Sequence, residues 1–367
     1  MAPDIHSKLG ASGAHRWLLC PGSVKAIDDA PEPPESPFAA EGHAAHAVAE
    51  SCLKNNKPTG AVLNIDPEMA ESVQEYVDYV KALGGKQEYE QLVDYSDWVK
   101  DGFGTADAIV IVDDLLHVID LKYGKGVPVD ADDNPQGKLY ALGALSEREM
   151  LQKFSKVVIH IHQPRLDHVS TWETTPCKLY AWAEWVRERA ALTELEFPER
   201  VPGEKQCRWC SAKPTCHAIA IRTENALMTE FKDLTVSTPP TADKLTDQDL
   251  QFVLNNKPLI EQWLKSVEDY VRTRIESGEQ FPGWKIVHGR ANRKWTDETE
   301  AEKTLIKLLK DKAHTKKLIS VAQAEKALGK EGKDKIKDFV TKPEGAPVLV
   351  PDTDNREAIS FITADDF

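Results

Sequence analysis

Three residues near the middle of the chain have the types and spacing of a metal-dependent hydrolase site. Asp107 and Asp120 lie in two apolar runs, "GTADAIVIV" and "LLHVIDLKYG", which are separated by Asp113 and Asp114. If those two residues form a hairpin loop, the register places Asp107 directly opposite Asp120. Lys122 then points to the same face as Asp120, because strand side chains alternate.

This arrangement suits the hydrolysis of a phosphodiester. Like charges directly opposite each other in a sheet are destabilising, and a divalent cation between the carboxylates would remove the conflict. Hard oxygen ligands favour Mg²⁺ or Mn²⁺. A lysine beside them could position an attacking water or stabilise charge on a phosphate. The alternative at this point is a surface hairpin with two aspartates at a sheet edge and an unrelated lysine.

A second group of residues could hold a metal through sulfur. Cys207, Cys210 and Cys216 lie within the stretch "QCRWCSAKPTC". In a reducing compartment, such a cluster is more typical of a metal site than of a disulfide framework. Three thiolates leave one position of a tetrahedral site open, and His217 could complete an independent zinc knuckle.

The composition indicates a soluble protein of two domains. The chain has 367 residues, of which 41% are hydrophobic, and its net charge is −14. It has no apolar run long enough to span a membrane, and its first residues lack the pattern of a secretory signal, so we expect a cytoplasmic protein. The acidic balance argues against a protein that coats DNA, although residues 285–342 are net positive.

The elements that must position these residues follow from periodicity and capping. We expect helices over 38–54, 66–83, 134–147 and 178–196, and strands over 103–112, 115–124, 156–163 and 168–175. Asp66 and Asn134 each precede a proline and are expected to cap helices. This order predicts an α/β layered domain over residues 1–232. A linker over 233–246 and a mainly helical region over 247–367 follow.

The ordered motifs resemble the PD-(D/E)XK nuclease superfamily. "GTAD" ends in Asp107, and Asp120 to Lys122 form a D-x-K. Two further motifs resemble its RecB-like branch: "GHAAH", which contains His46, and "QGKLY". Together with "SGAHRWLLCPGS", they resemble RecB-like proteins of phages and prophages over residues 8–220. The chain departs from many relatives at Asp120, where they carry glutamate.

The resemblance implies a central mixed sheet flanked by helices and a role for each motif residue. The implied metal ligands are His46, Asp107, Asp120 and the backbone carbonyl of Leu121. Lys122 is the implied catalytic lysine, and Gln136 and Tyr140 would organise the site and contact DNA. Taken alone, His46 and Tyr140 would be ordinary helix residues, and His43 competes with His46 for any role.

The resemblance also proposes a fourth cysteine ligand. In RecB-like nucleases such as AddB, one cysteine before the nuclease core and three after it hold an iron–sulfur cluster. Cys20 would therefore complete a [4Fe–4S] site with Cys207, Cys210 and Cys216, with Zn²⁺ as the alternative metal. Cys52 and Cys177 are expected to be small buried side chains on helices.

The function expected from the sequence is that of a metal-dependent deoxyribonuclease. The resemblance suggests an exonuclease that acts on DNA ends in phage recombination or replication, inside a bacterial host cell. Expected partners are DNA and a phage single-strand-binding or annealing protein. The alternatives are a catalytically weak DNA-binding or assembly module that keeps the fold, and a zinc-stabilised protein with no role on nucleic acids. The sequence does not define polarity, strand preference, endonuclease or exonuclease mode, or oligomeric state.

Overall fold

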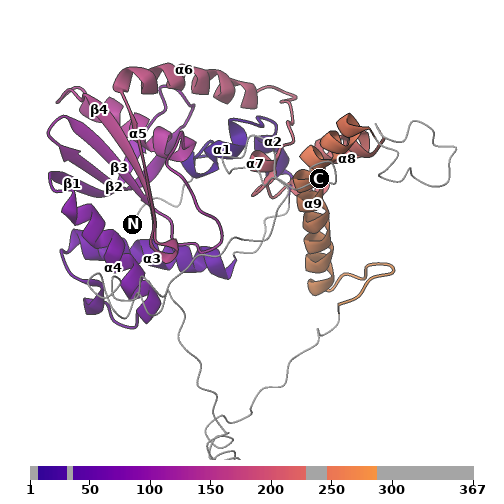
Figure 1. The fold of residues 1–367 in the computed structure, drawn as a ribbon, viewed down its shortest axis with the longest axis horizontal. Coiled ribbons are helices and arrows are strands. Elements are labelled where there is room, and N and C mark those ends of the chain that lie inside the picture. The colour runs from indigo at the N-terminus through magenta and orange to yellow at the C-terminus, as the bar shows by residue number, and fades with distance from the viewer. Residues whose placement is uncertain (1–6, 31–35, 229–245, 287–367) are drawn as a thin grey trace, which may run out of the picture. The chain divides into compact units, whose positions relative to one another are not determined.

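The computed structural model describes residues 7–30, 36–228 and 246–286 (Figure 1). The chain forms two compact units, Met1–Ile286 and Val287–Phe367. The second unit lies outside the described residues, and so do most of the predicted linker and most of the region 247–367. The region predicted to be mainly helical begins with one long helix, α9 (Asp247–Glu276), which belongs to the first unit.

A mixed sheet of five strands forms the centre of the first unit, in the order β1-β2-β3-β4-β5. Only β3 and β4 are parallel, and the other neighbours are antiparallel. The helix α5 (Pro135–Arg148) connects the two parallel strands, as a parallel connection requires. The strands are β1 (Lys86–Asp94), β2 (Phe103–Val112), β3 (Leu115–Leu121), β4 (Lys156–Gln163) and β5 (His168–Thr174).

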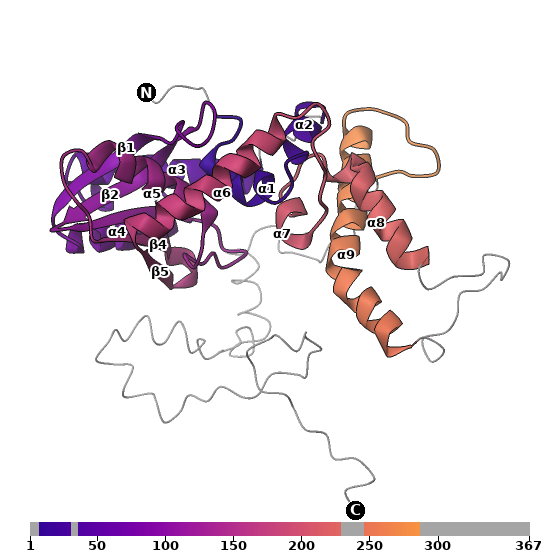
Figure 2. The same ribbon diagram turned by 90° about the horizontal axis from the view of Figure 1, so that it is seen from above.

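Helices cover both faces of the sheet, so the fold is a layered α/β structure (Figures 1 and 2). The helices α3 (Pro37–Lys54) and α4 (Pro67–Ala82) contribute to the hydrophobic core on one face. On the other face, the core includes residues from α5, α6 (Pro176–Thr193) and α1 (Ala14–Trp17). The remaining helices are α2 (Ser23–Asp28), α7 (Glu204–Cys207) and α8 (His217–Met228).

Two predicted helix starts are confirmed by their capping bonds. The Asp66 side chain accepts hydrogen bonds from the backbone N–H groups of Glu68 and Met69, at 3.0 and 3.1 Å. The Asn134 side chain accepts from Gln136 and from the next residue, at 3.0 and 3.2 Å. In both helices a proline follows the cap, where its missing N–H costs nothing. The second cap places Gln136 in the first turn of α5, beside the end of β3.

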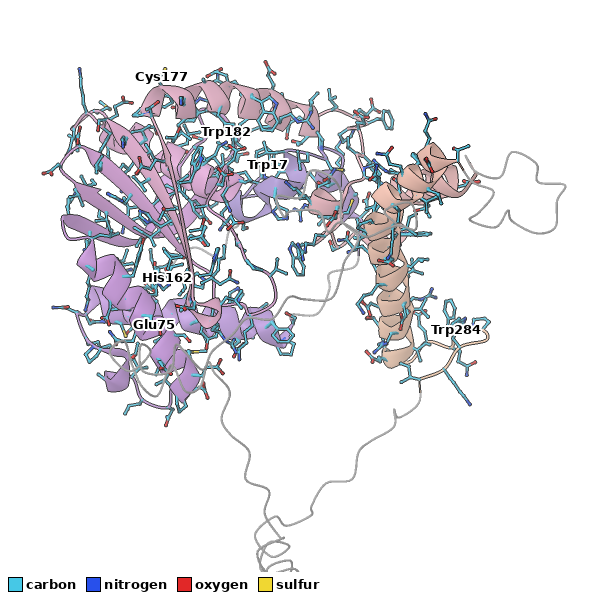
Figure 3. The ribbon with its side chains drawn as sticks, in the orientation of Figure 1. Trp17, Glu75, His162, Cys177, Trp182 and Trp284 are labelled. Atoms are coloured by element: carbon cyan, nitrogen blue, oxygen red, sulfur yellow. The ribbon has the colours of Figure 1, made fainter. Side chains whose placement is uncertain are left out.

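Two sequence predictions need correction. The strand β1 was not predicted, because its sequence "KQEYEQLVD" is largely polar. Cys177 is exposed at the start of α6 (Figure 3), whereas we expected it to be buried; Cys52, on α3, is buried as expected.

A buried histidine network lies between the sheet and α4. The Nδ1 atom of His117 lies 2.9 Å from Nε2 of His160, whose Nδ1 lies 2.8 Å from the Tyr79 hydroxyl. The centre of the His162 ring lies 4.9 Å from the centre of the Tyr79 ring and 5.7 Å from that of Tyr76. Burial lowers the pKa of His117, and it lowers the pKa of His160 and of His162 to about 4. These imidazoles are therefore neutral in the folded protein at neutral pH.

This network predicts a loss of stability in mild acid. An unfolded histidine has a pKa of about 6.5. The unfolded chain therefore takes up protons first as the pH falls from about 6.5 towards 4. Stability is fully present above that window and is lost within it. We expect His162→Phe to reduce the loss between pH 7 and pH 5 by about 1–2 kcal/mol. Urea unfolding at both pH values measures this.

The matched control for this experiment is His217→Gln, since His217 is exposed. The control should show the same pH dependence as the wild type. An unchanged pH dependence in His162→Phe would show that burial of this imidazole is not linked to acid sensitivity.

Candidate metal site and cysteine cluster

The predicted hairpin between β2 and β3 has the expected register. The two strands pair from Val112 with Leu115 to Ala108 with Ile119, which confirms a two-residue loop at Asp113 and Asp114. Asp113 adopts a left-handed conformation with φ 51°, as a tight turn of this kind requires.

The ladder between the two strands ends one residue before the predicted pair of aspartates. Asp107 would pair with Asp120, but this pair is not part of the ladder. The Oδ2 atom of Asp107 instead accepts the backbone N–H of Leu121 at 2.7 Å. The register still places Asp107 level with Asp120, and a carboxylate oxygen accepts a backbone N–H of β3 where the ladder ends.

Asp107 also lies at the point where the side chains of β2 switch from one hydrophobic core to the other. Ala106 packs in the core that includes α5, whereas Ala108 packs in the core that includes α3 and α4. Residues two apart on a regular strand share one face, so the alternation breaks at Asp107. Its Oδ1 atom lies 3.2 Å from Nδ1 of His46 on α3.

The structure adds a third carboxylate, from Glu90 on β1. Pairing on either side of Glu90, Tyr89 with Ala108 and Gln91 with Ala106, places it level with Asp107. Its φ of 48° is unusual for a non-glycine residue and interrupts the ladder. One ligand atom from each of His46, Glu90 and Asp107 lies within 4.8 Å of the others, so these residues form a possible metal-binding triad.

The electrostatics of this triad favour a cation. Burial raises the pKa of Glu90 to about 7, and the negative charge of Asp107 adds to the increase. Burial alone would lower the pKa of His46, but the Asp107 carboxylate raises it to about 9. Without a cation, protons partly neutralise the acidic charge of this cluster. Two carboxylates and an imidazole form an oxygen-rich set of ligands, suited to Mn²⁺ or Mg²⁺.

The other predicted residues form a hydrogen-bonded network beside the triad. The Lys122 ammonium lies 2.8 Å from Oδ2 of Asp120 and donates to the Gln136 side chain at 2.9 Å. The Gln136 amide in turn donates to Oδ1 of Asp120 at 2.9 Å and to the Tyr140 hydroxyl at 3.4 Å. Burial raises the pKa of Asp120, and the charge of Lys122 opposes the increase. Gln136 therefore holds the acid and the lysine in one arrangement.

Gly104 on β2 allows helix α5, which carries Gln136 and Tyr140, to lie close to the strand that carries Asp107. A Cβ atom on Gly104 would lie 2.8 Å from the Tyr140 ring, so only a glycine allows α5 to approach β2 this closely. The structure thus brings His46 to Asp107, and brings Asp120 to Lys122, Gln136 and Tyr140. Leu121 connects the two groups through its N–H. Glu90 was missed because its placement depends on β1, whose polar sequence gave no strand signal.

The four predicted cysteine ligands lie in one region of the structure. The Cys20 sulfur accepts the Val201 N–H at 3.2 Å, and the Cys207 sulfur accepts the Gly203 N–H at 3.4 Å. Burial raises the pKa of the Cys207 thiol to about 11, and the charges of Cys210, Cys20 and Cys216 add to the increase. His217, the alternative fourth ligand, is exposed at the start of α8. Among the described residues, no three cysteine sulfurs all lie within 4.8 Å of one another.

Gly22 explains how Cys20 reaches the other cysteines. Its N–H donates to the Glu199 carbonyl at 2.8 Å. A Cβ atom at Gly22 would lie 2.5 Å from the Pro198 carbonyl oxygen and 2.7 Å from that of Glu199. This close approach joins the segment after Cys20 to the segment before Cys207.

The fold and the site define a mixed α/β protein whose central sheet carries a possible metal-binding triad. The chain belongs to the family described as "Protein of unknown function (DUF2800)", which matches residues 6–357. Solved structures that it resembles include "Crystal structure of SSO0001", with 17% identity and a TM-score of 0.33 over 59% of this chain and 90% of that one. A likeness this weak carries no functional argument. None of the helices described here is long and apolar enough to cross a membrane.

The triad predicts that a divalent cation binds through Glu90 as well as through His46 and Asp107. We expect Glu90→Gln and Asp107→Asn each to weaken Mn²⁺ binding at least about 10–100-fold. That is the usual loss when a residue that only hydrogen-bonds to a metal ligand is replaced, and loss of a ligand itself should cost no less. Isothermal titration calorimetry with Mn²⁺ measures this. Glu50→Gln is the matched control, because Glu50 is a nearby acid whose partner is Lys54, at 2.7 Å. Wild-type affinity in Glu90→Gln would exclude Glu90 as a ligand.

Proposed function

We propose that the protein is a metal-dependent deoxyribonuclease of the PD-(D/E)XK type, from its RecB-like branch. The observation that carries this proposal is the network of Asp120, Lys122 and Gln136 beside the triad of His46, Glu90 and Asp107. Phosphodiester hydrolysis needs an acid and a lysine next to a bound cation, and neighbouring strands of this sheet carry these residues side by side. The ordered resemblance of the motifs further supports this class.

The residues present fit a divalent cation. Oδ2 of Asp120 is buried and makes no hydrogen bond of good geometry, although Lys122 lies 2.8 Å away. This oxygen therefore has a free acceptor site. His46 and Asp107 would hold Mg²⁺ or Mn²⁺ together with Glu90, and Asp120 and the Leu121 carbonyl are the further ligands implied by the resemblance. When bound, the cation would polarise a water molecule and offset the charge of the phosphate.

The protein's own groups would orient the reaction. Gln136 holds the Lys122 ammonium next to Asp120, so its positive charge is fixed before the substrate arrives. Lys122 would stabilise the negative charge that develops as water attacks phosphorus. The resemblance implies that the bond to the 3′ oxygen breaks and that the products carry 5′-phosphates. Tyr140, bonded to Gln136, would fix the amide and contact the DNA strand.

The biological setting follows from the resemblance alone. It supports an exonuclease on DNA ends in phage recombination or replication, in the cytoplasm of a bacterial host cell. A phage single-strand-binding or annealing protein is the partner that we propose for residues 247–367. Of that region, only residues 247–286 lie within the described part of the chain.

Cleavage of linear DNA with Mn²⁺ tests the proposed site. We expect Lys122→Ala and Asp107→Ala to lower the rate about 10²–10³-fold, the effect of removing one charge-stabilising group. Lys156→Ala is the matched control, since Lys156 pairs with the exposed Glu173 at the other end of the sheet. End-labelled linear and circular substrates would also separate exonuclease from endonuclease action.

The outcome distinguishes the two functions considered for this fold. Equal activity in the wild type and in both variants would exclude the proposed mechanism. Binding of DNA by the wild type without cleavage under any metal condition would favour the DNA-binding or assembly module.

We also propose that Cys20, Cys207, Cys210 and Cys216 hold a [4Fe–4S] cluster. The proposal is supported by the resemblance to RecB-like nucleases, in which one cysteine before the nuclease core and three after it hold such a cluster. It is also supported by the mutual influence of the four thiols, since the charges of Cys20, Cys210 and Cys216 all act on Cys207. A cluster would tie the N-terminal segment to the segment after α6, and closing so long a loop restricts the unfolded chain.

Anaerobic purification tests the cluster. We expect a brown wild-type protein with broad visible absorption, and loss of the colour in Cys20→Ser. Gly22→Ala should also lose it, because the added methyl group collides with the carbonyls of Pro198 and Glu199. Gly60→Ala is the control, since a Cβ there meets nothing within 4 Å. A colourless wild-type protein with stoichiometric zinc would contradict the cluster and favour Zn²⁺.

A further inference from the structure

A pocket of about 300 Å³ lies between the N-terminal segment and the cysteine cluster. Its walls come from residues 7–16 and from Trp209, which lies between Cys207 and Cys210. The two walls are far apart in the sequence, and Figures 1 and 2 both show α1 beside α7. The proposed metal site and cysteine ligands do not account for this pocket.

The described lining of the pocket is cationic and contains no acid. Lys8 lines it but is paired with Asp28 at 2.7 Å, so its charge is partly satisfied. The Arg16 guanidinium has no hydrogen-bond or ion-pair partner within the described part of the chain, and its Nε atom is buried. Cys20 and Cys210 influence Arg16 through their charge, yet neither sulfur forms a hydrogen bond with it in that part. An unpartnered guanidinium is suited to bind a phosphate.

An aromatic ring lines the same pocket as Arg16. Trp209 is 69% exposed, so its ring is open to solvent at the edge of the pocket. The guanidinium of Arg208 lies 5.7 Å from the centre of its ring. Exposed aromatic rings next to basic groups bind single-stranded nucleic acids, because a base stacks on the ring while its phosphate meets the cation. Bases in a duplex are already stacked and cannot use such a ring.

The pocket adjoins the proposed nuclease site. The segment around residues 11–17 packs against α5, the helix that carries Gln136 and Tyr140. His15, which lines the pocket, has a buried Nε2 atom with no partner among the described residues. The positive charge of Lys122 also reaches His15: it contributes to a lowered pKa, after the larger effects of burial and of Arg16.

We infer that this pocket binds one nucleotide of a single-stranded DNA segment, with its phosphate on Arg16 and its base on Trp209. The inference rests on the proposed function and extends it, because it defines the substrate as a single-stranded end or overhang. The strand would pass between the N-terminal segment and the cysteine cluster on its way to the nuclease site. The cysteine cluster would then have a second task, which is to hold Trp209 in place.

Binding of fluorescent oligo(dT) to the full chain tests this inference, in EDTA so that no cleavage occurs. We expect Trp209→Ala to weaken binding about 5–100-fold, the usual range for one stacked base. Its salt dependence should stay unchanged. Arg16→Gln should reduce the slope of log affinity against log salt by about 0.7, the value for one phosphate of a single strand. Neither variant should alter binding to a blunt duplex by a comparable factor.

Trp284→Ala is the matched control, since Trp284 is 72% exposed and lies beyond the end of α9 (Figure 3). Each variant is compared at equal metal content of the cysteine site. If Arg16→Gln loses that metal, Lys8→Gln replaces it as the charge variant. The inference is overturned if the pocket variants bind oligo(dT) as Trp284→Ala does, or lose duplex binding equally. It is also overturned if dTMP binds in a Trp209-dependent way but oligo(dT) does not compete.

This test separates the pocket from the nuclease proposal. If the pocket variants lose oligo(dT) binding while the wild type cleaves no DNA, the binding site stands and the nuclease proposal fails. If the wild type cleaves DNA and the pocket variants bind normally, only the pocket is overturned.

Discussion

The site depends on how the fold accommodates three acids at one level of three neighbouring strands. Glu90, Asp107 and Asp120 occupy matching positions on β1, β2 and β3. Buried like charges repel each other, so a regular ladder here would be unstable. Both ladders are interrupted at this level: Glu90 adopts a left-handed conformation, and Asp107 accepts the Leu121 N–H. The irregular backbone and the three acids therefore coincide at one level of the sheet.

The surrounding elements supply the positive charges that this arrangement needs. The helix α3 brings His46 to Asp107, and β3 continues to Lys122, which contacts Asp120. The helix α5 contributes no charge to the site but adds Gln136, which bonds to both the acid and the lysine. The close approach of α5 needs Gly104, so a single glycine on β2 couples helix packing to the geometry of the site.

Much of this could be predicted from sequence because it follows from local rules. The β2–β3 register needs only a two-residue loop, and the start of α5 needs only Asn134 and Pro135. Glu90 could not be predicted, because a polar edge strand is defined by its neighbour and not by its own pattern. Cys20 is similar: without the resemblance, no local signal connects it to Cys207. The expectation for Cys177 was wrong because composition does not tell which face of α6 is exposed.

The N-terminal segment connects the separate parts of the molecule. Residues 7–16 line the cationic pocket, Cys20 lies a few residues later among the other cysteines, and the same segment packs on α5. Coupling between sites passes through contiguous packed elements of this kind. Gly22 keeps this segment against the loop before Cys207, and the α5 contact connects it to Gln136. Because one short segment touches all three features, a metal at the cysteines would stabilise the pocket and the acid–lysine network together.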